Sequence, residues 1–194
     1  MKLRRDLKSI PVALAIGLWC GPLIATDKNP PAIDVFFSPA GGCTEAVVDA
    51  LKGAKLAVLV QAYSFTSAPI ARALVDAGKR GVNVQVILDS SQKAETYSSA
   101  DFLAHAGIRC FIDSKHSIAH NKVMVIDGST VITGSFNFTK AAEEQNAENL
   151  LVIQDVKLAS RFANNWRSHE KHSVRYLGRG KRSRPWFWSR PFRE

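Results

Sequence analysis

The sequence predicts an α/β domain in which a mixed β-sheet is flanked by α-helices on both faces. Short runs rich in apolar and β-branched residues recur along the chain, and several are separated by segments with helical periodicity. That alternation is typical of parallel β–α–β units. Asp127-Gly128 joins two further apolar runs and is a strong hairpin signal, which adds antiparallel strands.

Strands are expected where short apolar runs are bounded by turn residues. The run at 55–65 is too continuously apolar for a half-exposed strand, so it indicates a buried central one. The expected strands are 33–38, 55–65, 83–89, 108–113, 122–126, 131–136 and 149–155.

Helices are expected between these strands, beginning at residues that favour N-caps. Thr44 and Ser67 are the expected caps of the first two helices. A third helix is expected at 98–107 and the last at 156–172. The apolar side of the last helix consists of Leu158, Phe162 and Trp166.

The first 25 residues have the layout of a secretory signal peptide. A basic opening leads into a mostly apolar run from Ile10 to Ala25, and the following chain is polar and rich in proline. The run is short for a bilayer span and is interrupted by prolines and glycines, so a cleaved signal is favoured over a membrane anchor. We therefore expect a periplasmic or secreted protein whose folded domain spans 26–173.

The formal charge of +9 is concentrated at the two ends of the chain. Residues 1–25 carry +3 and residues 171–194 carry +7, whereas residues 26–170 sum to −1. Attraction for polyanions is therefore expected from the C-terminal tail or from a local site. The basic, aromatic tail at 174–194 is expected to be mobile, although its composition also suits a nucleic-acid clamp or contact with an anionic membrane.

Cys43 and Cys110 are the cysteines left after removal of a signal peptide. Two cysteines in an oxidising compartment can pair. The sequence does not give their separation, so a disulfide and two free thiols both stay open.

One segment collects polar side chains suited to phosphate chemistry. His120 and Lys122 lie two apart and share a face if their strand begins by His120, and Ser135 and Asn137 are spaced in the same way across the hairpin. Lys122, Ser135 and Asn137 could hold the non-bridging oxygens of a phosphodiester while an imidazole attacks phosphorus.

The spacing H-N-K-x4-D-x6-G-S-x-N, from His120 to Asn137, resembles the HKD signature of the phospholipase D superfamily. The likeness extends to AYSFTS near residue 63, to FNFTKAAE and to ENLLVI, and covers roughly residues 33–170. Small bacterial endonucleases with a single motif are the most similar members. The resemblance implies a phospholipase D-like sandwich and a phosphodiester hydrolase.

Only one stretch of the sequence carries this motif, whereas larger members of the superfamily carry two. The resemblance therefore implies a homodimer in which each copy supplies half of the site. His120 of one copy would attack phosphorus and form a phosphohistidine, and His120 of the other would protonate the leaving oxygen. Lys122, Ser135 and Asn137 would bind phosphoryl oxygens, and Glu148 would orient the nucleophilic imidazole.

Asp127 and Gly134 complete the signature, and the hairpin position of Asp127 favours a structural role in the turn. The implied scheme requires no metal and no cofactor. The sequence has neither a tight carboxylate cluster for Mg²⁺ nor the Cys/His spacing of a zinc site. His169 and His172 lie three apart near the end of the last helix and, like His116, are expected to have no special role.

The leading interpretation is a metal-independent, non-specific endonuclease acting on DNA or also on RNA. The nearly neutral body fits recognition of the phosphodiester itself rather than of base edges. The alternative is a phospholipase D or cardiolipin hydrolase, because the same chemistry cleaves lipid phosphodiesters. A polyanion-binding protein with a decayed site is disfavoured because the polar set is intact. The sequence leaves open which ester bond breaks and which nucleic acid is preferred.

Overall fold

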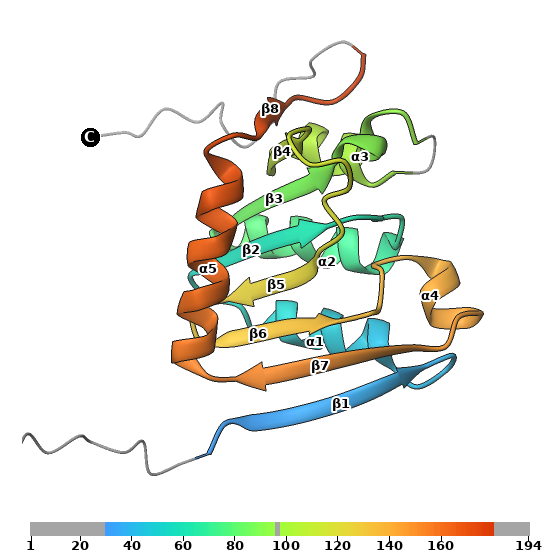
Figure 1. Cartoon of the computed structure of the whole chain (residues 1–194), viewed down its shortest axis with the longest axis vertical. Coiled ribbons are helices and arrows are strands. Elements are labelled where there is room, and N and C mark those ends of the chain that lie inside the picture. The colour runs from blue at the N-terminus through green and yellow to red at the C-terminus, as the bar shows by residue number, and fades with distance from the viewer. Residues whose placement is uncertain (1–29, 96–97, 181–194) are drawn as a thin grey trace, which may run out of the picture. The chain divides into compact units, whose positions relative to one another are not determined.

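The computed structural model describes residues 30–95 and 98–180. The predicted signal peptide lies outside the described residues, as does most of the predicted C-terminal tail. Within the described residues an eight-stranded mixed sheet carries helices on both faces, which confirms the predicted fold class (Figure 1). None of the described helices has the length and hydropathy needed to cross a membrane.

The elements alternate much as the sequence predicts. The strands are β1 (Ala32–Ser38), β2 (Ala57–Ala62), β3 (Asn83–Asp89), β4 (Arg109–Asp113), β5 (Lys122–Ile126), β6 (Thr130–Gly134), β7 (Glu148–Gln154) and β8 (Val174–Tyr176). The helices are α1 (Cys43–Gly53), α2 (Ala68–Lys79), α3 (Ala100–His105), α4 (Lys140–Glu144) and α5 (Val156–Glu170), with a 3₁₀ turn at Ser90–Lys93. The short α4 and β8 were not predicted.

The strand order is β1-β7-β6-β5-β2-β3-β4-β8. Several strands begin or end along the same side of the sheet, which we describe as one edge, across the strand direction. β2, β3 and β4 are parallel, whereas β5 runs antiparallel to β2, so the last residue of β2, Ala62, pairs with the first residue of β5, Lys122. β6 ends and β7 begins at the same edge, where Gly134 pairs with Leu150. We call this edge, marked by Ala62, Lys122 and Gly134, the site edge.

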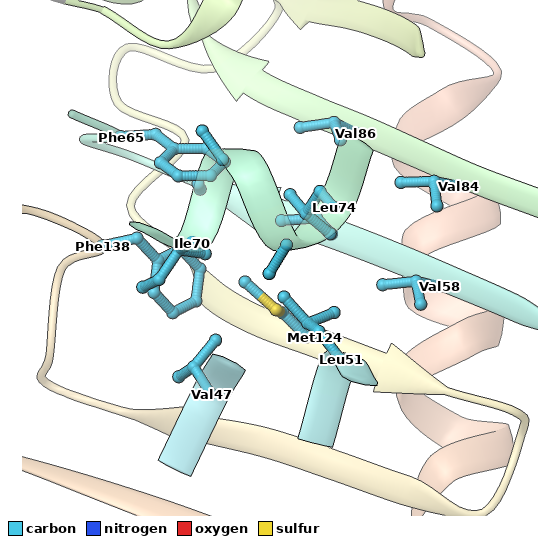
Figure 2. Packing of buried hydrophobic residues seen from close by; sticks show 14 of the residues in the cluster. Val47, Leu51, Val58, Phe65, Ile70, Leu74, Val84, Val86, Met124 and Phe138 are labelled. Carbon is cyan, nitrogen blue, oxygen red and sulfur yellow. The ribbon is translucent and has the colours of Figure 1, made fainter. Parts of the chain in front are cut away.

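The larger hydrophobic core lies between the sheet and the helices α1, α2 and α3. Figure 2 shows Leu51 of α1 and Leu74 of α2 beside Val58 and Met124 of the central strands. All four side chains are fully buried. Burial of each contributes on the order of 2 kcal/mol, so this layer fixes the positions of β2 and β5.

The opposite face of the sheet is covered by α5, which contacts β6, β5, β2 and β4 (Figure 1). Leu158 and Phe162 pack on the sheet, and Trp166 is only 2% exposed. The Trp166 indole N–H donates a 2.8 Å hydrogen bond to the carbonyl of Val60. The predicted apolar side of this helix is therefore confirmed.

The predicted N-caps are only partly right. The N-cap of α1 lies two residues earlier than predicted, at Gly42 in the left-handed conformation, so Thr44 lies inside the helix. The Thr44 backbone N–H instead donates to the carboxylate of Glu143, at 2.6 Å. A residue distant in sequence thus takes the place of a local cap. Ser67 does occupy the N-cap of α2, but its side chain makes no capping hydrogen bond.

The predicted boundary between domain and tail falls too early. Val174–Tyr176 forms β8, which pairs with β4. The Tyr176 hydroxyl donates to the Asp101 carboxylate at 2.7 Å, and Arg179 binds the same carboxylate through its backbone N–H and its Nε. These contacts make the chain up to this arginine part of the folded domain.

Cys43 and Cys110 are both free and buried. Cys43 begins α1, which contacts β1 and β7, whereas Cys110 lies in β4, five strand positions beyond β7. At about 4.8 Å per strand, five steps separate the two thiols by roughly 24 Å, far beyond disulfide reach. The possible disulfide is therefore wrong for this fold, and burial raises the pKa of both thiols, that of Cys43 to about 11.

Candidate active site

The residues predicted to form the site all lie at the site edge. His120 lies two residues before Lys122, which begins β5. Ser135 and Asn137 follow the end of β6, and Glu148 begins β7. Because β5, β6 and β7 are neighbours in the sheet, the topology brings the whole set together.

The relation between His120 and Lys122 differs from the one predicted. β5 begins at Lys122 rather than at His120, so the two do not alternate along one strand. The His120 side chain is exposed, whereas Lys122 is only 7% exposed. The Lys122 Nζ donates to the backbone carbonyl of His120 at 2.9 Å. The ammonium therefore holds the backbone that carries the imidazole.

Lys122 has donor capacity to spare. Burial lowers its pKa from the ordinary value, and the nearby carboxylate of Glu148 opposes that shift. Among the described residues, Lys122 forms no ion pair with a carboxylate. An ammonium has three N–H donors, and one is used on the His120 carbonyl. The remaining donors can bind an anionic oxygen at this edge.

Tyr63 is a site residue that the sequence reasoning did not single out. Its ring lies 4.6 Å from the His120 ring between centroids, and Lys122 Nζ lies 5.1 Å from the Tyr63 centroid. The Tyr63 backbone N–H donates to the carbonyl of Asn121 at 2.9 Å. The available signal was an aromatic residue directly after a buried strand, in the AYSFTS stretch.

The Ser135 hydroxyl is fixed from the neighbouring strand β7. It accepts hydrogen bonds from the backbone N–H and the side-chain amide of Asn149, at 3.1 and 3.3 Å. Gly134 precedes it with φ +148°, and a Cβ there would collide with the Asn149 carbonyl oxygen. Glycine is therefore required for this close approach of β6 and β7.

Asn137 carries an unsatisfied polar atom. Its side chain is half-buried, and within the described part of the chain its Oδ1 is buried without a hydrogen-bond partner. Buried polar atoms are usually paired, so an unpaired one at a concave or shared site points to a missing partner. A substrate or a second protein copy would supply it.

Glu148 is anchored at the site edge through its neighbours. Its Oε1 accepts from the side-chain amide of Asn146 at 3.1 Å, and its backbone N–H donates to Ser38 Oγ at 3.2 Å. Within one chain, the described residues include no hydrogen bond between Glu148 and His120. Within a single copy, Glu148 therefore does not orient the His120 imidazole through a hydrogen bond.

The loop before His120 is held by a buried carboxylate that the sequence reasoning also missed. Asp89, at the end of β3, accepts a 2.7 Å hydrogen bond from the Ala119 backbone N–H and a 2.9 Å bond from the Ser91 N–H. Burial raises the pKa of Asp89, but these donors outweigh it, so the pKa lies below its ordinary value. Asp89 thereby fixes the residue next to His120.

Asp127 lies at the opposite edge from the site. It follows the last residue of β5 in a turn with φ +52°. Its carboxylate accepts hydrogen bonds from the backbone N–H groups of Lys55, Leu56 and Ala57, at 2.9, 2.8 and 3.0 Å. Its motif position thus has the structural role that the turn predicts.

A further polar cluster lies where β4 ends. It consists of Asp113, His116, His169 and His172, whose potential ligand atoms all lie within 4.8 Å of one another. The sequence reasoning gave the three histidines no special role, because the segments that carry them are far apart in the chain. Their contact depends on α5 reaching β4.

Residues 47–169 match the family model described as cardiolipin synthase, PLD-like domain. The chain is 42% identical over 138 residues to phospholipase D of Rickettsia bellii, covering 71% of this chain and 69% of that protein. It is 34% identical over 112 residues to mitochondrial cardiolipin hydrolase of Xenopus laevis, covering 58% and 53% of the two chains. The crystal structure of Nuc from Salmonella typhimurium, a phospholipase D family member, matches with a TM-score of 0.73 at 40% identity, covering 76% of this chain and 99% of that one.

The fold and the site edge therefore define a phosphodiester hydrolase. The chain belongs to the phospholipase D superfamily, through its PLD-like domain.

Proposed function

We propose that the protein is an endonuclease that hydrolyses DNA at a site shared by two copies of the chain. The observation that carries this proposal is the composition of the site edge, which offers one exposed imidazole and one buried ammonium per copy. In-line displacement at phosphorus needs a nucleophile on one side and a proton donor on the other. One His120 cannot occupy both positions, whereas two related by a twofold axis can.

The proposed reaction has two steps. The imidazole of His120 attacks phosphorus, an N–P bond forms, and the P–O bond to the leaving oxygen breaks as the second His120 donates its proton to that oxygen. The second imidazole then takes a proton from water, whose oxygen attacks phosphorus and breaks the N–P bond. Lys122 of each copy stabilises the charge on the non-bridging oxygens.

The unpaired groups of the single chain support the shared site. Among the described residues, the Asn137 Oδ1 lacks a donor, and Glu148 makes no hydrogen bond to its own His120. A partner copy would bring an imidazole N–H to these acceptors. Two imidazoles that are identical in sequence can then carry different protonation, because sites in contact titrate as a pair.

Nucleic acid is the favoured substrate because of the likeness to Nuc, at 40% identity over nearly all of that chain. The net charge of −1 over residues 26–170 supports cleavage without reading of base sequence, since basic side chains are not in excess there. Export through the N-terminal 25 residues stays a prediction, and it would place this activity in the periplasm or outside the cell.

Hydrolysis of a lipid phosphodiester is the second candidate. It is favoured by the similarity to proteins named phospholipase D and mitochondrial cardiolipin hydrolase. Ile118, two residues before His120, is 58% exposed and adds an apolar side chain beside the site. The attack on phosphorus would be the same, and only the groups flanking the phosphate would differ.

One experiment separates these candidates. Supercoiled plasmid and cardiolipin vesicles are incubated in parallel with the mature protein, with His120→Ala and with His105→Ala as a matched histidine replacement in α3. We expect nicked plasmid with the wild type and His105→Ala, and intact plasmid with His120→Ala. Intact plasmid together with hydrolysed cardiolipin would reject the nuclease and support the lipid hydrolase.

A further inference from the structure

Three histidine rings converge on a single carboxylate oxygen at the end of β4. Asp113 Oδ2 lies 3.0 Å from His116 Nδ1, 2.8 Å from His169 Nδ1 and 3.2 Å from His172 Nε2. Asp113 ends β4 and His116 lies in the loop that leads to His120, whereas His169 lies in the last turn of α5 and His172 two residues after its end. Three segments of the chain therefore meet at one point.

Hydrogen bonding alone accounts poorly for this convergence. A carboxylate oxygen has two lone pairs, so it accepts two well-formed hydrogen bonds and not three. The other oxygen, Oδ1, is already bound by the Lys115 backbone N–H at 3.0 Å. The three rings are also crowded, with centroid separations of 4.9, 5.2 and 5.3 Å.

A metal ion removes both difficulties, because each ring nitrogen then donates a lone pair to the ion instead of a proton to the oxygen. In a tetrahedral zinc site with bonds of about 2.0–2.1 Å, ligand atoms lie roughly 3.3 Å apart. The three N–Oδ2 distances are each within about half an ångström of that value. Three imidazole nitrogens and one carboxylate oxygen are donors that zinc accepts.

We propose that Asp113, His116, His169 and His172 bind a divalent transition-metal ion, zinc by preference, in a structural site. Four protein ligands complete a tetrahedral shell, which is typical of structural rather than catalytic zinc. The side chain of Asp113 is fully buried, whereas that of His116 is 44% exposed. The site thus has a fixed buried ligand and an open side by which the ion enters.

The bound ion would stabilise the loop that leads to His120. His116 precedes His120 by four residues, and the intervening Ala119 is bound by Asp89. The metal would connect this loop to β4 and to the end of α5, in addition to the ring contacts of His116 with His169 and His172. None of the four ligands contacts His120 in the described structure, so the ion supports the site without entering the reaction.

Metal content tests the proposal directly. The mature protein, purified without a histidine tag, is analysed by plasma mass spectrometry beside His169→Ala, Asp113→Asn and the matched control His105→Ala. We expect about one zinc per chain in the wild type and in the control, and loss of zinc from the two ligand variants. Zinc retained at wild-type level in both ligand variants would overturn the assignment.

A second measurement covers variants that fail to fold. The wild type is stripped with a zinc chelator and titrated with Zn²⁺ while its Tm is followed, and with Co²⁺ while its visible spectrum is followed. We expect a rise in Tm, the absorption bands of tetrahedral Co²⁺, and affinity weakened by at least about tenfold in His172→Ala. A Tm indifferent to Zn²⁺ in a wild type that also carries no zinc after purification would reject the site. Neither readout depends on nuclease or lipase activity.

Discussion

The rings of Tyr63 and His120 lie 4.6 Å apart with 57° between their planes. Tyr63 directly follows β2 and His120 precedes the antiparallel β5, so the contact joins two loops at the site edge. The same tyrosine ring lies 5.1 Å from Lys122 Nζ. One aromatic ring therefore positions both the imidazole and the ammonium, and its hydroxyl is not needed for either contact.

Replacement of Tyr63 tests this positioning. We expect Tyr63→Phe to keep most of the activity because the ring remains, and Tyr63→Ala to lower kcat by roughly 10- to 100-fold because His120 loses its support. Steady-state kinetics on plasmid or on a small phosphodiester would measure both. Equal losses in the two variants would show that the hydroxyl, and not the ring, is what matters.

Asp89 should affect activity through the loop that it holds. Asp89→Ala removes the acceptor of the Ala119 N–H, so the residue beside His120 is no longer fixed. We expect kcat to fall by about tenfold or more with little change in KM, and the free energy of unfolding to fall by about 2 kcal/mol. Kinetics and urea unfolding measure the two effects. Unchanged kcat in a correctly folded variant would contradict the role in positioning.

Asp127 is a carboxylate that, like Asp89, accepts backbone hydrogen bonds, but it lies at the opposite edge of the sheet from the site and so serves as a control for Asp89. Asp127→Ala removes three backbone hydrogen bonds, so we expect the free energy of unfolding to fall by about 2 kcal/mol while kcat per folded molecule stays near that of the wild type. A large loss of kcat at temperatures where the variant is folded would show that this carboxylate acts on the site after all.

The stabilisation by Asp127 should also depend on pH. Burial opposes its ionisation, but the backbone donors dominate and lower its pKa below the ordinary value. Because the folded pKa lies below the unfolded one, the stabilisation is fully present above about pH 4 and is lost as pH falls through the folded pKa. Unfolding of the wild type and Asp127→Asn between pH 7 and pH 3 should therefore converge on acidification. A constant difference would contradict the ionised role.

Replacement of Lys122 should have the opposite effects to replacement of Asp127, with a large loss of activity and no loss of stability. Lys122→Met removes the ammonium that is to bind phosphoryl oxygens, and we expect kcat to fall by roughly 100-fold or more. Burial lowers the pKa of Lys122, so the charged form destabilises the fold. The variant should therefore equal or exceed the wild type in Tm at neutral pH, and the difference should shrink as pH rises toward about 10. A large drop in Tm at neutral pH would mean that the charge is satisfied in the folded protein.

The sequence predicted those parts of the fold that depend on local pattern. The run at 83–89 became β3 with the predicted bounds, and Asp127-Gly128 forms the predicted turn between β5 and β6. The single motif identified the residues of the site edge because its spacing is contiguous in the chain. These features depend on neighbours in sequence, which a pattern records directly.

Features that depend on distant pairs were missed. Glu143 caps α1 from nearly a hundred residues away, and β8 forms only because β4 offers a free edge. The cluster of Asp113 and three histidines combines residues of β4, its following loop and α5. Spacing within the sequence carries no trace of such contacts. The question of a disulfide stayed open for the same reason, since the separation of the two cysteines is set by strand order.

Mixing wild type with an inactive copy tests whether two chains share one site. If both His120 side chains are needed, a dimer with one His120→Ala chain is inactive even though each chain folds. After equal amounts are unfolded together and refolded, random pairing leaves about one quarter of the dimers fully wild type. We expect about one quarter of the activity of the same total concentration of wild type, measured on plasmid, with light scattering to verify that the species is a dimer.

Equal mixing with His105→Ala, whose change lies away from the site, should leave activity near the wild-type level and so controls for losses in refolding. Activity near one half, proportional to the wild-type chains alone, would mean that each chain works by itself, and an active monomer would independently lead to the same conclusion.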